Sequence, residues 1–221
     1  MAQPPCSCCY DDAFDQAHAQ RVLRDYRKKG PGRASVAIAD ALAGDDATGM
    51  TVLDIGAGVG AVHHLLLARG ASSATDVDAS GPYLAAAREE SERLGLAERV
   101  THLHGDFVSR APEVEPADLV ALDRVVCCYV DMPQLVGRAA ERTSRRLAIT
   151  LPPDLLIARI VIRILNAWEW ITRSDFRVQA HSHAAVVAAA RAAGLEPVSA
   201  EYVGTWRLLV FERPSVSAGS Q

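Results

Sequence analysis

The amino-acid sequence predicts an α/β fold in which a mainly parallel sheet is covered by helices on both faces. Short nonpolar segments alternate with helical segments through most of the 221 residues, and such alternation is typical of parallel sheets. A glycine-rich turn at residues 56–60 joins the first of these segments to a helix. The last two nonpolar segments have no helix between them, so we expect the final strand to run antiparallel.

Helical periodicity predicts seven helices, and glycine or proline marks most of their ends. The helices are expected at residues 11–29, 34–43, 60–69, 82–94, 133–143, 154–173 and 182–193. A glycine closes five of them: Gly30, Gly44, Gly70, Gly95 and Gly194. Pro82 occupies the first helical position of the fourth, where its missing N–H has no partner to lose.

Short nonpolar runs between these helices predict seven strands. They are expected at residues 50–55, 73–77, 100–104, 118–122, 146–151, 195–202 and 206–212. A tight turn at Gly204-Thr205 joins the last two. We find no internal repeat and no linker, so the chain is expected to form one domain.

Composition excludes several classes of partner. The chain is 49% hydrophobic and 23% charged with a net charge of −4, which provides no attraction to nucleic acid or to an anionic membrane. No run approaches the roughly 18 nonpolar residues of a membrane span, and the first residues lack the features of a secretory signal. We therefore expect a cytoplasmic protein whose five cysteines are thiols, because disulfides are rare in that compartment.

The glycine turn predicts a nucleotide site of the Rossmann-like kind. A ligand at the carboxyl ends of parallel strands needs close contact with the backbone, which Gly56, Gly58 and Gly60 allow. Asp78 lies 18 residues after Gly60, at the end of the second strand. A carboxylate in that place accepts hydrogen bonds from ribose hydroxyls.

Two features argue against a dinucleotide. The turn is GxGxG rather than the GxGxxG of pyrophosphate-binding turns, and Asp54 would repel a pyrophosphate while suiting a cationic amino group. A short-chain NAD-dependent enzyme would also need a Tyr-x-x-x-Lys pair, which the chain lacks.

The segment VLDIGAGVG resembles motif I of the class I S-adenosylmethionine (SAM)-dependent methyltransferases. Asp78-Ala79-Ser80, Gly105-Asp106-Phe107 and the stretch 118–131 follow in the order and spacing of that family. The resemblance implies a seven-stranded Rossmann-like fold and SAM as cofactor. It implies contacts with the cofactor from Asp54, Gly56, Ala57, Gly58, Gly60, Asp78, Ala79, Asp106, Phe107, Asp123, Arg124 and Val125.

The stretch after the fourth strand bears on the methyl acceptor. The segment DRVVCCYVD, residues 123–131, is also similar to a segment of magnesium-protoporphyrin IX methyltransferases, with Val130 in place of a proline. Two histidines of many relatives are replaced by Cys127 and Cys128. Methyl transfer mainly needs alignment, so a base is not required; the candidates for one are His104, Cys128 and Tyr129.

Two helices are candidates for enclosing the acceptor. Residues 154–173 are nonpolar over most of the helix circumference, which suits core packing, a lid, a homodimer surface or a peripheral membrane contact. Tyr26, on the N-terminal helix, is a candidate cofactor contact from the other side. The chain thus divides into a tail and cap helices (1–45), a SAM-binding core (50–151) and an acceptor side (152–221).

The sequence therefore predicts methyl transfer from SAM to a small, nonpolar or aromatic acceptor, with oxygen or nitrogen favoured as the methylated atom. Two alternatives stay open. Cys6, Cys8 and Cys9 could act with the later cysteine pair in a thiol-assisted metalloid methyltransferase, although no metal site is predicted. A SAM-fold protein without catalysis, acting as a partner of another protein, is the second.

Overall fold

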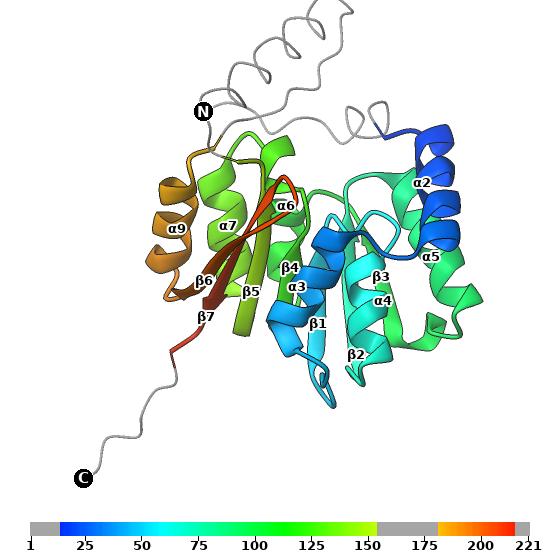
Figure 1. The fold of residues 1–221 in the computed structure, drawn as a ribbon, viewed down its shortest axis with the longest axis horizontal. Coiled ribbons are helices and arrows are strands. Elements are labelled where there is room, and N and C mark those ends of the chain that lie inside the picture. Colours follow the sequence, from blue (N-terminus) through cyan, green and yellow to red (C-terminus); the bar gives the residue numbers. More distant parts are fainter. Residues whose placement is uncertain (1–13, 154–180, 215–221) are drawn as a thin grey trace, which may run out of the picture.

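The computed structural model describes residues 14–153 and 181–214, and a seven-stranded sheet forms its centre (Figure 1). The strand order is β3-β2-β1-β4-β5-β7-β6. Only β7 runs against the rest, pairing antiparallel with β5 and β6. The predicted fold class is confirmed. The strands are β1 (Thr51–Ile55), β2 (Ser73–Asp78), β3 (Val100–His104), β4 (Ala117–Leu122), β5 (Thr143–Leu151), β6 (Glu196–Val203) and β7 (Trp206–Glu212).

Helices cover both faces of the sheet (Figure 1). They are α2 (Gln16–Lys29), α3 (Arg33–Ala43), α4 (Ala61–Ala68), α5 (Gly81–Arg93), α6 (Phe107–Arg110), α7 (Met132–Glu141) and α9 (His183–Ala192). The nonpolar residues of α3 and α4 form a core on one face, and those of α6, α7 and α9 form a core on the other. The expected helix at 154–173 lies outside the described residues. Among the residues that are described, no helix is long and nonpolar enough to cross a membrane.

Strand β1 lies at the centre of this arrangement and is buried on both sides. Val52 packs into the core beneath α3 and α4, whereas Leu53 and Ile55 pack into the opposite core, as alternation along a strand requires. The chain runs outward from β1 to β2 and β3 and then returns to β4 on the other side of β1. The loops after β1 and β4 consequently diverge at their carboxyl ends, where open α/β sheets bind ligands.

Helix α2 lies beside α5 and is docked on it (Figure 1). Asp15 caps its first turn by accepting the His18 N–H at 2.8 Å. The Arg27 guanidinium contacts the Glu89 carboxylate at 2.9 Å and the buried Glu90 carboxylate at 2.7 Å. These ion pairs hold the C-terminal end of α2 against α5.

Candidate active site

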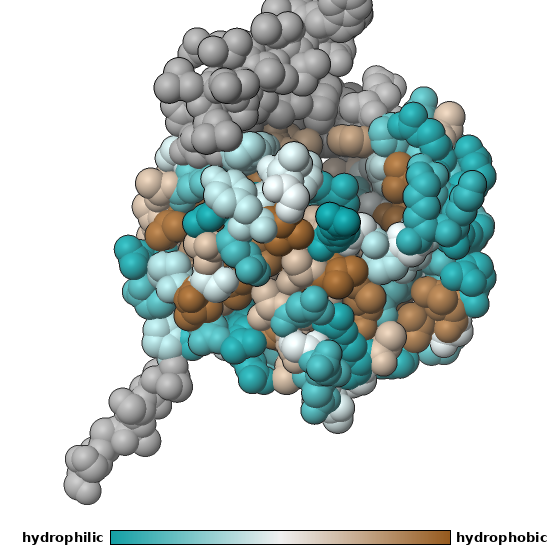
Figure 2. Space-filling model, viewed as in Figure 1, coloured by the Kyte–Doolittle hydropathy of each residue, from teal (hydrophilic) through white to brown (hydrophobic). Residues whose placement is uncertain are grey.

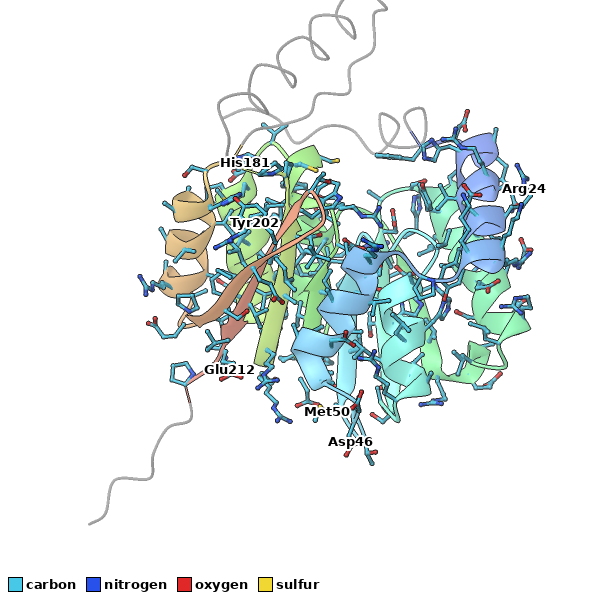
Figure 3. The ribbon with its side chains drawn as sticks, in the orientation of Figure 1. Arg24, Asp46, Met50, His181, Tyr202 and Glu212 are labelled. Atoms are coloured by element: carbon cyan, nitrogen blue, oxygen red, sulfur yellow. The ribbon has the colours of Figure 1, made fainter. Side chains whose placement is uncertain are left out.

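A cavity of about 340 Å³ opens at the carboxyl ends of β1, β2 and β4. Figure 2 shows the surface hollowed beside α2, with nonpolar side chains inside the hollow. Figure 3 places His181 at the same end of the strands, and Asp46 and Met50 at the opposite end. Of the residues predicted to contact the cofactor, the lining includes Gly56, Ala57, Gly58, Asp78, Ala79, Asp106, Phe107, Asp123, Arg124 and Val125. It does not include Asp54, Gly60 or Tyr26.

The glycines of the turn are required for two different reasons. Gly56, Gly58 and Gly60 have φ values of 64°, 60° and 85°, a region that residues with a Cβ atom rarely adopt. A Cβ on Gly56 would lie 2.6 Å from the Val125 side chain, so close packing adds to the requirement there. Gly58 faces the cavity with no such contact, and a Cβ there would lie 3.7 Å from the Tyr83 ring.

Asp54 holds the glycine turn from behind and does not line the cavity. The N-terminal cap of α4 is Gly60, which has no side chain to accept a hydrogen bond. The buried Asp54 carboxylate is the hydrogen-bond acceptor instead. It accepts the His63 backbone N–H at 3.2 Å and contacts His63 Nδ1 at 2.9 Å. The Asp54 carboxylate therefore does not line the cavity in which the SAM amino group is expected. Asp54 positions the start of α4 instead.

Asp78, at the end of β2, lines the cavity. One carboxylate oxygen accepts the Gly58 N–H at 3.1 Å, and the other accepts the Ser80 N–H at 2.8 Å. Burial raises the pKa of this carboxyl to about 6, although both hydrogen bonds oppose the rise. Asp76, two residues earlier, contacts His102 Nδ1 at 2.8 Å and does not line the cavity. Asp78 is thus the carboxylate that β2 presents to a ligand.

The turn after β3 forms one end of the cavity. Asp106 caps α6 by accepting the Ser109 N–H at 3.0 Å, and the buried Phe107 follows it. Both residues line the cavity, as does Ala79. His104 does not; it is exposed, with Nε2 3.2 Å from the Ala79 carbonyl oxygen. The structure therefore does not place this candidate base beside the ligand.

The turn after β4 carries a strained residue. Arg124 has a φ of 63°, the only positive φ of a residue other than glycine in the described part of the chain. Its N–H donates to the Thr150 hydroxyl at 2.8 Å, and that hydroxyl donates to the Asp123 carboxylate at 2.7 Å. The Ser35 hydroxyl donates to the same carboxylate at 2.7 Å. This network holds the strained turn at the edge of the cavity.

The strain at Arg124 predicts that glycine is tolerated there better than alanine. Both substitutions remove the guanidinium, but alanine keeps the Cβ that disfavours the left-handed conformation. We expect the Arg124→Gly variant to be more stable than Arg124→Ala by about 1 kcal/mol, after the entropy cost of glycine. Urea unfolding of the two variants measures the difference. An alanine variant as stable as the glycine variant would show that the turn is not strained.

Cys128 and Tyr129 also line the cavity, immediately after this turn. The Tyr129 carbonyl oxygen lies 2.8 Å from His181 Nε2, which ties the turn to the segment before α9. The Cys127 and Cys128 sulfurs are 3.7 Å apart. Two of the three candidate bases, Cys128 and Tyr129, are therefore at the cavity. The tail cysteines at positions 6, 8 and 9 lie outside the described residues.

Phe14 and helix α2 contribute cavity residues that sequence reasoning missed. Phe14, His18 and Val22 line the cavity, whereas Tyr26 packs beside His64 with their ring centroids 6.2 Å apart. His18, Val22 and Tyr26 are spaced four residues apart and so share one face of α2, and Phe14 comes just before the helix. The Ser80 hydroxyl donates to the Phe14 carbonyl at 3.0 Å and fixes this end over the cavity. The spacing of these residues is visible in the sequence. Which of them line the cavity is not.

A family comparison supports the motifs. Residues 52–148 match the family model described as a methyltransferase domain. This matched segment, 97 of the 221 residues, is similar to a methyltransferase domain. The chain is 36% identical over 122 residues to a release factor glutamine methyltransferase from Moorella thermoacetica. That match covers 52% of this chain and spans only 40% of the length of the relative.

Solved structures agree with this methyltransferase fold. A magnesium protoporphyrin IX methyltransferase from Synechocystis PCC 6803 with bound S-adenosylhomocysteine (SAH) superposes with a TM-score of 0.74 at 20% identity. That match covers 95% of this chain and 100% of the other. An O-methyltransferase family protein from Burkholderia thailandensis has a TM-score of 0.72 at 18% identity, covering 95% and 62% of the two chains. At these identities the likeness concerns the fold.

The charges around the cavity suit a cationic ligand. Among the described lining residues, three carboxylates, from Asp78, Asp106 and Asp123, stand against the guanidinium of Arg124. Arg124 is itself paired with Asp123, at 3.2 Å. SAM carries a sulfonium, an ammonium and one carboxylate, so its net charge is positive. The carboxylates therefore favour SAM electrostatically.

Proposed function

We propose that this protein transfers the methyl group of SAM to a small, nonpolar or aromatic acceptor, at an oxygen or nitrogen atom. The observation that carries the proposal is the placement of the Asp78 carboxylate. It is buried, held by the Gly58 and Ser80 N–H groups, and shares one cavity with the Phe107 and Cys128 turns. A buried carboxylate held in place at the cavity suits the hydroxyl groups of a ribose.

The proposed orientation of SAM follows from this arrangement. Asp78 accepts hydrogen bonds from the ribose hydroxyls, and Asp106 with Phe107 lies beside the adenine. The methionine part lies along Gly56 and Gly58, where the missing side chains allow close contact with the backbone. The methyl group then points toward the turn after β4. Asp54 acts in this arrangement by positioning the glycine turn, through its bonds to His63.

The acceptor is proposed to enter between α2 and the turn after β4. Val22, Tyr129 and Leu135 make this part of the lining largely nonpolar. The enzyme mainly aligns the acceptor atom with the methyl group for in-line displacement. Where the acceptor carries a proton at neutral pH, His18 on α2 is the side chain we propose to accept it, because the imidazole lines the cavity.

Transfer of a tritiated methyl group tests the proposal. The protein is incubated with methyl-labelled SAM and a panel of phenols, aromatic amines and carboxylic acids, and the organic extract is counted. We expect label in at least one acceptor, together with an equal amount of SAH. A protein that binds SAH in calorimetry but labels nothing across the panel would favour the non-catalytic partner protein instead.

A further inference from the structure

Two thiols on the turn after β4 form a pair beside the cavity. Their Sγ atoms lie 3.7 Å apart; Cys128 lines the cavity and Cys127 is buried next to it. The short 3-10 turn Val126–Cys128 holds them, with the Cys128 N–H donating to the Val125 carbonyl at 2.9 Å. Both sulfurs also contact the Arg124 carbonyl oxygen, at 3.4 Å and 3.9 Å, so they lie side by side on this turn.

We propose that Cys127 and Cys128 form a dithiol site for a trivalent arsenical whose hydrocarbon group lies in the nonpolar part of the cavity. Thiolates bind soft centres in preference to hard ones. With a sulfur–ligand bond of about 2.3 Å, as in zinc thiolates, sulfurs 3.7 Å apart subtend roughly 107° at a shared atom. That angle suits a pyramidal or tetrahedral centre.

The spacing also separates this class of ligand from linear soft cations. A two-coordinate ion between opposed thiolates would need the sulfurs about 4.6 Å apart, twice the same bond length. The observed 3.7 Å is well short of that distance. The third position of a pyramidal centre would then face the cavity, where Tyr129 and Leu135 offer nonpolar contacts to a hydrocarbon group.

The surroundings of the two thiols favour their attack on the arsenical. The hydrogen bond from Cys128 lowers the pKa of the Cys127 thiol, and the Arg124 guanidinium acts in the same direction. That bond and burial raise the pKa of Cys128. The pair thus offers one thiol that ionises readily and one that keeps its proton as a donor, which suits stepwise attack.

Binding is a double substitution at arsenic without any redox change. In the hydrated oxide, arsenic carries one carbon substituent and two hydroxyl groups. Each thiol forms one arsenic–sulfur bond while one arsenic–oxygen bond breaks, and each thiol proton leaves with a hydroxyl group as water. Arsenic stays trivalent throughout. The site stands independently of the proposed methyl transfer, because binding needs no SAM.

Phenylarsine oxide is the probe that tests the site. The three tail cysteines are first replaced, as C6S, C8S and C9S, because neighbouring thiols there could bind the same reagent. Intact mass spectrometry then measures incorporation into the full chain. We expect one phenylarsenic group per chain, removed by excess 2,3-dimercaptopropanol and resistant to the same concentration of 2-mercaptoethanol.

Single variants of the pair separate chelation from ordinary thiol labelling. Cys127→Ser and Cys128→Ser should each weaken retention of the arsenical at least about 100-fold, since the second bond is intramolecular. Circular dichroism and thermal unfolding check that both variants fold, with Cys127→Ala as a further variant. Retention by either serine variant equal to that of the parent, or no incorporation into the parent, would overturn the proposal.

Discussion

The Gly58→Val variant is expected to lose detectable binding of SAM and SAH while keeping its fold. Gly58 has a φ of 60° and faces the cavity, where a valine side chain would lie against Tyr83 and fill space that the ligand needs. The backbone would also turn its N–H away from Asp78, which now accepts it at 3.1 Å. Calorimetry with SAH should show affinity weakened at least about 100-fold, or about 2.7 kcal/mol.

Gly44→Val is the matched control for this variant. Gly44 has a φ of 59°, nearly that of Gly58, and a Cβ on it would meet no atom within 4 Å. It ends α3 and does not line the cavity. Both variants should lose similar stability from backbone strain, but only Gly58→Val should lose the ligand. Normal SAH affinity in Gly58→Val would refute the assignment of this turn to the cofactor.

Binding of SAH is expected to weaken as the pH falls below about 6, and Asp78→Asn should remove that dependence. The ribose hydroxyls donate to an ionised carboxylate, whereas burial raises the pKa of Asp78 to about 6 in the unliganded protein. Each pH unit below 6 should therefore raise the Kd about tenfold. The asparagine variant should bind about 100-fold more weakly at pH 7.5, since bonds to a charged group contribute about 1.5–3 kcal/mol each.

As the pH rises, ionisation of Asp78 strengthens binding of SAH but lowers the stability of the unliganded protein. A carboxyl whose folded pKa lies above its ordinary value of 3.8 takes up a proton more readily in the folded state. The unliganded protein therefore loses stability through Asp78 as the pH rises from about 4 to 6. At 1.36 kcal/mol per pKa unit the ionised group costs about 3 kcal/mol above that window.

Calorimetry with SAH between pH 5 and 8, on wild type and Asp78→Asn, measures the binding effect. Urea unfolding of the unliganded proteins between about pH 4 and pH 7 measures the stability effect as the difference between the two. His64 and His102 also have lowered pKa values through burial, and they remain in both proteins, so the comparison isolates Asp78. A wild-type affinity that stays constant from pH 7 to pH 5 would contradict the assigned role of this carboxylate.

Much of the fold was accessible from the sequence because its signals are local. Strand three and the last strand agree with β3 and β7 at both ends, and glycines mark the ends of most helices. The antiparallel final strand followed from the missing helix before it. Placing Asp78 at the cavity required only the end of a strand and a glycine turn on its neighbour, both of which periodicity and spacing reveal.

The expected contact residues that do not line the cavity depend on packing that the sequence alone does not show. Asp54 was expected to face the ligand, but the glycine cap of α4 needs an external acceptor, and only the fold brings His63 to this carboxylate. Tyr26 shares one face of α2 with His18, yet the docking of α2 on α5 decides which of them reaches the cavity. The left-handed Arg124 left no trace in the sequence, since nothing about arginine predicts that conformation.

A crystal structure of the protein with SAH tests the proposed site most directly. We expect ligand density in the cavity at the carboxyl ends of β1, β2 and β4, with both ribose hydroxyls within hydrogen-bond distance of Asp78. The adenine should lie beside Asp106 and Phe107, and the sulfur should face the turn that carries Arg124 and Cys128. Density in which the ribose makes no contact with Asp78, or a ligand bound outside this cavity, would contradict the proposed site.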